Sequence, residues 1–114
     1  MKSLKKLIPL DRKVTIYIPG TNGVSEAADN TGWAEQAAAL LSSLYGGATS
    51  QENIGYWVSG TGKLVTEKII TVYAYASKLS DSDVGRVVEF CETLKRELKQ
   101  EVISLEIDNK LYFV

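Results

Sequence analysis

The sequence predicts a single α+β domain, and three observations carry this prediction. Strand-like alternation of β-branched and aromatic residues occurs at 14–18, 53–58, 63–76 and 102–107. Apolar residues at helical spacing occupy 33–44 and about 81–99, between those strands. The 114 residues suffice for one two-layer core. The order β, α, β, β, α, β is typical of the ferredoxin-like plait, an antiparallel sheet with both helices on one face, here followed by a short C-terminal strand.

The first strand begins at Val14 and is ended by a Pro-Gly pair. We expect Val14, Ile16 and Ile18 to face the core, because side chains alternate along a strand. The connection from 19 to 31 is unusually long, and ordered loops of this length are often functional. The alternative is a mobile flap.

The first helix follows this loop, with Asn30 or Thr31 available as its N-cap. Gly46 stands after it, where a left-handed residue commonly ends a helix. The apolar residues of the helix share one face, which we expect to pack on the sheet: Trp33, Ala37, Leu40, Leu41 and Leu44.

The strands at 53–58 and 63–76 are joined by Ser-Gly-Thr-Gly, whose glycines permit the positive φ of hairpin turns. Both faces of 63–76 carry apolar residues, whereas a strand with one wet face alternates more cleanly. Either this strand is central and twisted, or its second face is covered by a partner subunit or by the 19–31 loop. A plait leaves one sheet face open, so we expect a homodimer through that face.

The second helix begins with Ser80, Asp81, Ser82 and Asp83, which resemble a capping box with acids at the positive end of the helix dipole. Cys91 lies on its apolar face, so we interpret it as a buried, inert thiol. Asp-Asn at 108–109 then turns the chain into the last strand, 111–114.

Charge divides the chain into a basic N-terminal arm, 1–13, and a domain, 14–114. The arm carries five bases and one acid, which leaves eight bases against thirteen acids in the domain. Because binding to nucleic acid requires a basic face, an acidic domain disfavours that partner. The arm could still contact an anionic surface, although a solvated leader is the simpler interpretation.

Apolar runs in the sequence are all short of the roughly 20 residues that span a bilayer. The segment from Leu4 to Leu10 is interrupted by two lysines and a proline, so it lacks the apolar region of a signal peptide. We therefore expect a cytoplasmic protein that does not contact a membrane. The single cysteine excludes an internal disulfide.

Histidine is absent, which removes the commonest general base and the usual transition-metal ligand. We expect neither a metal nor a cofactor. The stretch from Gly60 to Lys63 lacks the spacing of a phosphate-binding loop and precedes a strand. Pro19 to Gly23 follows a strand and precedes a helix, but its glycines lack the dinucleotide-binding spacing, so we interpret it as a structural turn.

Glu67 is the one carboxylate that the sequence singles out as a possible acid or base. It lies in mid-strand among apolar residues, an environment that suits a carboxylate to proton transfer. Alternatively, it pairs with a lysine or faces solvent. An apolar pocket or a dimer interface could be lined by Tyr56, Trp57, Tyr73 and Tyr75, although aromatic residues at strand spacing are more often part of a core.

The middle third of the chain holds a succession of aromatic, glycine and polar residues: Trp33, Tyr45 to Thr49, Gly55 to Trp57, Gly62, Val65 and Glu67. This succession resembles the pattern of an uncharacterised family of short bacterial and mobile-element α+β proteins. The ending from Gln100 to Glu106 fits it loosely. The resemblance implies no reaction, but it marks possible binding residues: Gly46, Gly47, Thr49, Trp57 and Glu67.

Three hypotheses about function follow from these observations. We favour an interaction or regulatory module that binds another macromolecule, with a protein as a possible partner, through the open sheet face or the 19–31 loop. The second is a cofactor-free enzyme of the dimeric α/β-barrel type, with an apolar cavity and Glu67 as its acid or base. The third is a sensor that binds a small ligand in the same cavity without turnover.

Overall fold

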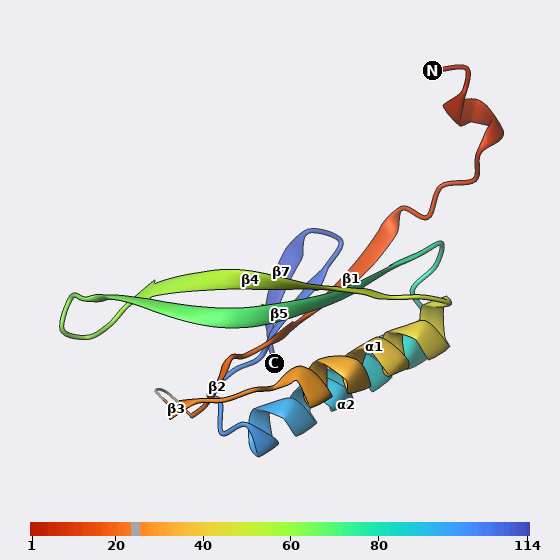
Figure 1. Ribbon diagram of the computed structural model, residues 1–114. Coiled ribbons are helices and arrows are strands. Elements are labelled where there is room, and N and C mark those ends of the chain that lie inside the picture. The colour runs from red at the N-terminus through yellow and green to blue at the C-terminus, as the bar shows by residue number, and fades with distance from the viewer. Residues whose placement is uncertain (24–25) are drawn as a thin grey trace.

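The computed structural model describes residues 1–23 and 26–114 and confirms the predicted fold class. A five-stranded sheet has the order β4-β5-β1-β6-β7 with every neighbouring pair antiparallel, and the two helices lie on one of its faces (Figure 1). The elements of this layer pair are β1 (Arg12–Ile18), α1 (Thr31–Tyr45), β4 (Thr49–Val58), β5 (Leu64–Ala76), α2 (Asp81–Glu97), β6 (Ser104–Ile107) and β7 (Lys110–Phe113). A short 3-10 turn, η1 (Leu4–Lys6), precedes them in an arm that projects from the body.

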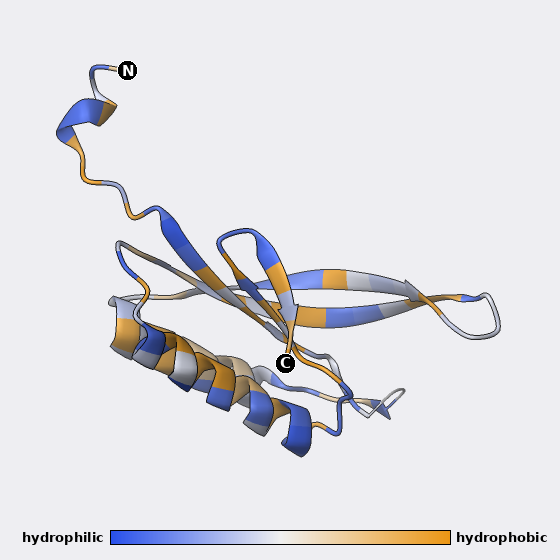
Figure 2. Ribbon diagram, turned by 180° about the vertical axis from the view of Figure 1, so that it is seen from behind, coloured by the Kyte–Doolittle hydropathy of each residue, from blue (hydrophilic) through white to orange (hydrophobic). Residues whose placement is uncertain are grey.

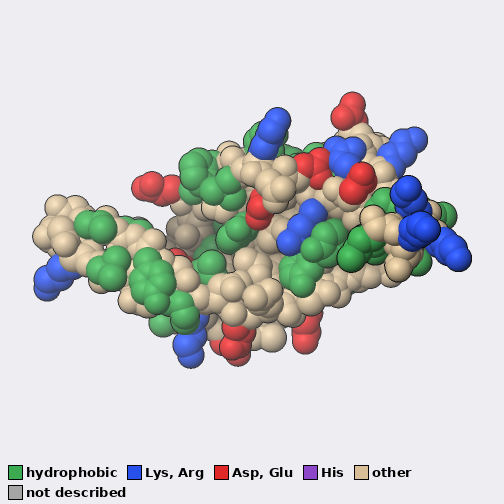
Figure 3. Space-filling model, turned by 90° about the horizontal axis from the view of Figure 1, so that it is seen from above, with side chains coloured by type: hydrophobic (Ala, Val, Ile, Leu, Met, Phe, Trp, Pro, Cys, Tyr) green, Lys and Arg blue, Asp and Glu red, His purple; other side chains and the backbone are tan. Residues whose placement is uncertain are grey.

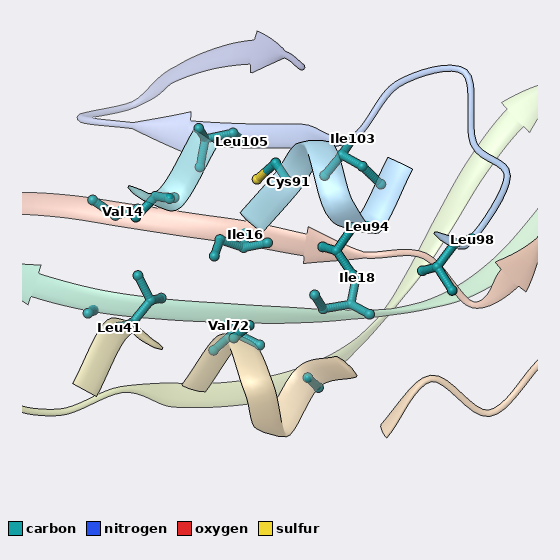
Figure 4. Close-up of a cluster of buried hydrophobic side chains, with 14 residues drawn as sticks. Val14, Ile16, Ile18, Leu41, Val72, Cys91, Leu94, Leu98, Ile103 and Leu105 are labelled. Carbon is teal, nitrogen blue, oxygen red and sulfur yellow. The ribbon is translucent and has the colours of Figure 1, made fainter. Parts of the chain in front are cut away.

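The core lies between the sheet and the helices. Val14, Ile16 and Ile18 are almost fully buried, as predicted, and they meet Leu41 of α1 and Leu94 of α2 (Figure 4). Hydrophobic and hydrophilic bands alternate along both helices, as expected for helices with one buried face (Figure 2). None of the helices in the described residues is long and apolar enough to cross a membrane.

The C-terminus of α1 and the N-terminus of α2 are formed by the residues that the sequence predicted. Gly46 has φ 92° and donates its N–H to the Ser42 carbonyl at 2.8 Å, so it is the left-handed residue that ends α1. Ser80 accepts the N–H of Asp83 at 3.2 Å and caps α2. Asn30 is the N-cap residue of α1, as predicted, but its side chain makes no cap bond, and the Asp29 carboxylate accepts the N–H of Thr31.

Asn30 has a different role, since its side-chain amide donates to the Pro19 carbonyl at 2.7 Å. This bond joins the two ends of the 19–31 loop. Within the loop, β2 (Thr21–Asn22) and β3 (Glu26–Ala27) form a two-stranded ladder. Residues 24 and 25, which follow β2 in the sequence, lie outside the described residues.

The β4–β5 hairpin extends well beyond the rest of the sheet (Figure 1). All ten residues of β4 pair with β5, whereas β1 pairs only with residues 70–76 of β5. The sequence interpretation placed the start of this strand at 53, which is wrong, because the polar residues Thr49 to Glu52 already belong to it. They lie on an edge strand, where polar side chains reach solvent. Several apolar side chains of the hairpin are exposed (Figure 3): Ile54, Tyr56, Val58 and Leu64.

The side of the sheet away from the helices is called here the open sheet face. Thr15 and Tyr17 of β1 point to it, because their neighbours in the strand are in the core. Residues directly opposite in antiparallel strands share a face. The open sheet face therefore also holds Thr71, Tyr73, Tyr75, Glu106, Leu111 and Phe113. Since β5 lies between β4 and β1, its apolar character on both faces fits a central strand.

The β6–β7 turn is formed by Asp108 and Asn109, both at positive φ, as the sequence predicted. Asp108 also joins this turn to β1. Its carboxylate accepts from Arg12 Nε at 2.7 Å and from the Lys13 N–H at 3.0 Å. The backbone hydrogen bond from Lys13, followed by that from Arg12, lowers the pKa of Asp108. Arg12 and Lys13, the last two residues of the expected basic arm, are thus strand residues.

Asp108→Asn is expected to lower the stability of the protein at pH 7, because the amide cannot replace a charged acceptor. A carboxylate whose pKa is lowered by folding stabilises the fold above its unfolded pKa, and this contribution disappears as the pH falls through the lowered value. The urea midpoint of Asp108→Asn should therefore be lower than that of wild type at pH 7. The two midpoints should become equal well below about pH 4. Glu101→Gln, an exposed carboxylate, is the matched control and should show no such pH-dependent difference. A difference that is equal at both pH values would contradict this role of Asp108.

Candidate functional site

Glu67 lies in the projecting half of β5, opposite Gly55 of β4 and beyond the last residue that pairs with β1. Its side chain is partly buried. Oε2 accepts the N–H of Gly20 at 3.2 Å and lies 3.3 Å from the Thr21 hydroxyl, which can also donate to it. The loop that follows β1 therefore crosses β5 and holds one oxygen of this carboxylate.

Gly20 makes this crossing possible. A Cβ atom at this position would lie 1.7 Å from the Lys68 carbonyl oxygen, so the two backbones approach more closely than any side chain permits. The backbone N–H of Gly20 can reach Glu67 only at this short separation. A glycine that the sequence interpretation assigned to a structural turn is thus part of the site.

A large hollow adjoins Glu67, and we call it the loop cleft. It encloses about 850 Å³ between the 19–31 loop and the projecting part of β5. This is within the usual range for small-molecule sites, which hold a few polar groups in an apolar lining. Trp57, Val65 and Ile69 supply apolar surface, and the carboxylates of the lining come from Asp29, Glu52 and Glu67.

A second, smaller hollow of about 210 Å³ is called here the sheet groove. Its lining includes Tyr17, Tyr56, Ile69, Gln100 and Ser104. Glu67 and Trp57 line both hollows. Glu67 is therefore at the junction of two concave surfaces, with one oxygen held by the loop.

The other predicted site residues lie elsewhere. Gly46 and Gly47 connect α1 to β4, and Thr49 pairs with Tyr73 at the opposite end of the hairpin. Tyr73 is on the open sheet face, with the Lys13 ammonium 4.5 Å from its ring centre. These four residues line neither hollow, so the structure brings together only Trp57 and Glu67 of the predicted set.

The cysteine and the acidic residues of the described part of the chain do not gather in one place. Burial raises the pKa of the Cys91 thiol to about 12, and its sulfur is in the core. Among residues 1–23 and 26–114, no three Asp, Glu or Cys side chains gather as a metal site would require.

On the open sheet face, burial and the adjacent Glu106 raise the pKa of Tyr17, whose hydroxyl donates to that carboxylate at 3.2 Å.

No protein-family model matches the chain, and no curated protein matches it. Two solved structures are similar in fold. A phage SAM lyase in complex with S-methyl-5'-thioadenosine has a TM-score of 0.68 and 19% identity, over 95% of this chain and 92% of the other. A phage SAM lyase in the apo state has a TM-score of 0.62 and 18% identity, over 90% and 87% of the two chains. At these identities the likeness establishes the fold.

Proposed function

We propose that the protein cleaves S-adenosylmethionine (SAM) and releases S-methyl-5'-thioadenosine. The observation that carries this proposal is the Glu67 carboxylate, which is held by Gly20 and Thr21 beside the loop cleft of about 850 Å³. The similar fold of a SAM lyase that binds S-methyl-5'-thioadenosine supports it. This makes the enzyme hypothesis preferable to the interaction module that the sequence favoured.

The reaction can proceed without a cofactor. Release of S-methyl-5'-thioadenosine breaks the bond between the sulfonium sulfur of SAM and the γ carbon of its methionyl chain. The bonding electron pair moves to sulfur and neutralises its charge. In the simplest balanced route, the carboxylate of SAM itself attacks the γ carbon and closes a homoserine lactone, so water, oxidant and net proton transfer are not needed. The protein then contributes mainly orientation of the reacting groups.

Glu67 can supply this orientation by binding the α-ammonium group of SAM. If Glu67 instead lay beside the sulfonium, it would stabilise the substrate more than the transition state, because the sulfonium charge disappears during the reaction. Such a contact would slow the reaction. The ammonium keeps its charge throughout, so its ion pair with Glu67 can fix the attacking carboxylate without slowing the reaction. In this arrangement Glu67 acts in positioning, and not as the acid or base that the sequence suggested.

Trp57 provides the surface for the other end of the substrate. Its ring lines the loop cleft and is 42% exposed, so one face is available to stack on an adenine. Val65 and Ile69 continue the apolar lining toward Glu67. The cleft thus offers an aromatic and apolar wall and a carboxylate within a single hollow, which matches the two ends of SAM.

The proposal is tested by incubating purified protein with SAM and identifying products by liquid chromatography with mass spectrometry. S-methyl-5'-thioadenosine and homoserine lactone should form in equal amounts and faster than in buffer. Binding of SAM without products would favour the sensor hypothesis. If SAM neither binds nor reacts, the enzyme proposal is wrong and the interaction module regains its place.

Self-association belongs to the same proposal, because the open sheet face leaves large apolar side chains uncovered. Tyr75, Leu111 and Phe113 are 48%, 53% and 70% exposed. Exposed apolar surface of this kind favours an interface. We expect a homodimer in size-exclusion chromatography with light scattering at micromolar concentration, and Phe113→Ser should weaken it. A wild-type protein that is monomeric under these conditions would contradict the dimer.

A further inference from the structure

The last turn of α2 places Gln100 beside the loop that follows β1. Leu98 donates its N–H to the Leu94 carbonyl at 2.8 Å, and Gln100 donates its N–H to the Lys95 carbonyl at 2.9 Å. Between them, Lys99 has φ 53°, a left-handed conformation that reverses the chain direction. Gln100 therefore leaves the helix end in a fixed orientation.

The side chain of Gln100 connects this helix end to the loop. Its Nε2 atom donates to the carbonyl oxygens of Thr21 and Gly23, both at 3.0 Å, and lies 3.2 Å from that of Leu98. Because these neighbours are all acceptors, the amide must present its NH₂ group to them. The Gly23 N–H completes the connection by donating to the Leu98 carbonyl at 2.8 Å.

This connection also includes the Thr21 hydroxyl. The hydroxyl has one proton and two acceptors in reach, the Gly23 carbonyl at 3.0 Å and Glu67 Oε2 at 3.3 Å. Gln100 donates to the Gly23 carbonyl and also lies 3.4 Å from the Thr21 oxygen, to which it can donate. The amide thereby holds the Thr21 hydroxyl beside Glu67.

We propose that Gln100 is a positioning residue, which fixes the segment from Gly20 to Gly23 so that this segment holds the Glu67 carboxylate toward the loop cleft. The effect on catalysis rests on the proposed function. The effect on the loop does not, because it depends only on the hydrogen bonds of Gln100. Removal of the amide takes a donor from the Thr21 and Gly23 carbonyls, so the loop is held less firmly and Glu67 can adopt other rotamers.

The experiment compares wild type with Gln100→Ala, and uses Gln36→Ala as the matched control because that glutamine is exposed on α1. Hydrogen exchange of the Gly20 amide, which donates to Glu67, is measured by NMR, together with the amides of Ile16 and Val72 in the core. In Gln100→Ala we expect the Gly20 amide to exchange about tenfold faster than in wild type, the effect of losing one net hydrogen bond. The exchange rates of the core amides should be unchanged. Gln36→Ala should match wild type at all three positions.

Kinetics of SAM cleavage then separate positioning from a general structural effect. Gln100→Ala should lower kcat/KM about tenfold in the wild-type background, but less than about twofold when Glu67→Gln is also present, because the two residues act through one group. Gln100→Lys, which keeps donors at this reach, should recover part of the loss.

Unchanged exchange at Gly20 in Gln100→Ala would overturn the proposal, whether or not the protein cleaves SAM. Equal losses of kcat/KM with and without Glu67→Gln would also overturn it, because Gln100 would then act independently of Glu67. Faster exchange at Gly20 together with an inactive wild type would instead contradict the proposed function and leave the loop role of Gln100 supported.

Discussion

Glu67→Gln is expected to lower kcat/KM for SAM cleavage by about 100-fold, the usual order of effect when one member of a desolvated charge pair is removed. The amide keeps the size of the side chain and can still accept from Gly20 and Thr21 through its oxygen. It loses the charge that pairs with the α-ammonium group of SAM. The loss should be measured by steady-state kinetics of S-methyl-5'-thioadenosine release.

Glu89→Gln is the control for this change, because Glu89 is exposed on α2 and lines neither hollow. Its kcat/KM should equal that of wild type. The urea midpoint of Glu67→Gln should also be close to the wild-type value, so that a kinetic loss cannot arise from unfolding. An active Glu67→Gln with wild-type kcat/KM would remove Glu67 from the site.

Gly20→Ala is expected to destabilise the fold by about 3 kcal/mol, at the upper end of the usual effect of overpacking. The new methyl group would overlap the Lys68 carbonyl oxygen, which is backbone and cannot rotate away. The loop must therefore lift from β5, which also separates the Gly20 N–H from Glu67. Chemical denaturation measures the first effect and SAM turnover the second.

The control for Gly20→Ala is Gly85→Ala, on the exposed side of α2. A Cβ atom there meets nothing within 4 Å, and alanine is the better helix former. Gly85→Ala should therefore stabilise the protein by about 0.5 to 1 kcal/mol. If Gly20→Ala is as stable as wild type, the close approach of the loop to β5 does not exist in solution.

The fold was predictable because its signals are local. Alternation marked β1 and β5, the Ser80 cap and the Gly46 terminus bounded the helices, and Asp108 with Asn109 formed the expected turn. The start of β4 was missed because its first residues are polar, and polarity on an edge strand resembles a loop.

The site was only partly predictable because its contacts join distant parts of the chain. Glu67 was singled out from its apolar neighbours, but Gly20 and Thr21 meet it only through tertiary structure, and so does Gln100 meet Thr21. The one signal in the sequence that could have pointed to this loop as part of the site was Pro-Gly-Thr directly after a strand. The resemblance marked Gly46 and Gly47 as possible binding residues, but Gly46 is the left-handed residue that ends α1. The resemblance to mobile-element proteins stays a prediction.

The most direct test of the proposed site is a crystal structure of the protein with S-methyl-5'-thioadenosine. We expect the adenine against Trp57 in the loop cleft, with the sulfur turned toward the side of the cleft where Gly20 and Thr21 hold Glu67. A ligand bound only outside the loop cleft, or a cleft that stays empty at saturating ligand, would contradict the assignment of this site to SAM cleavage.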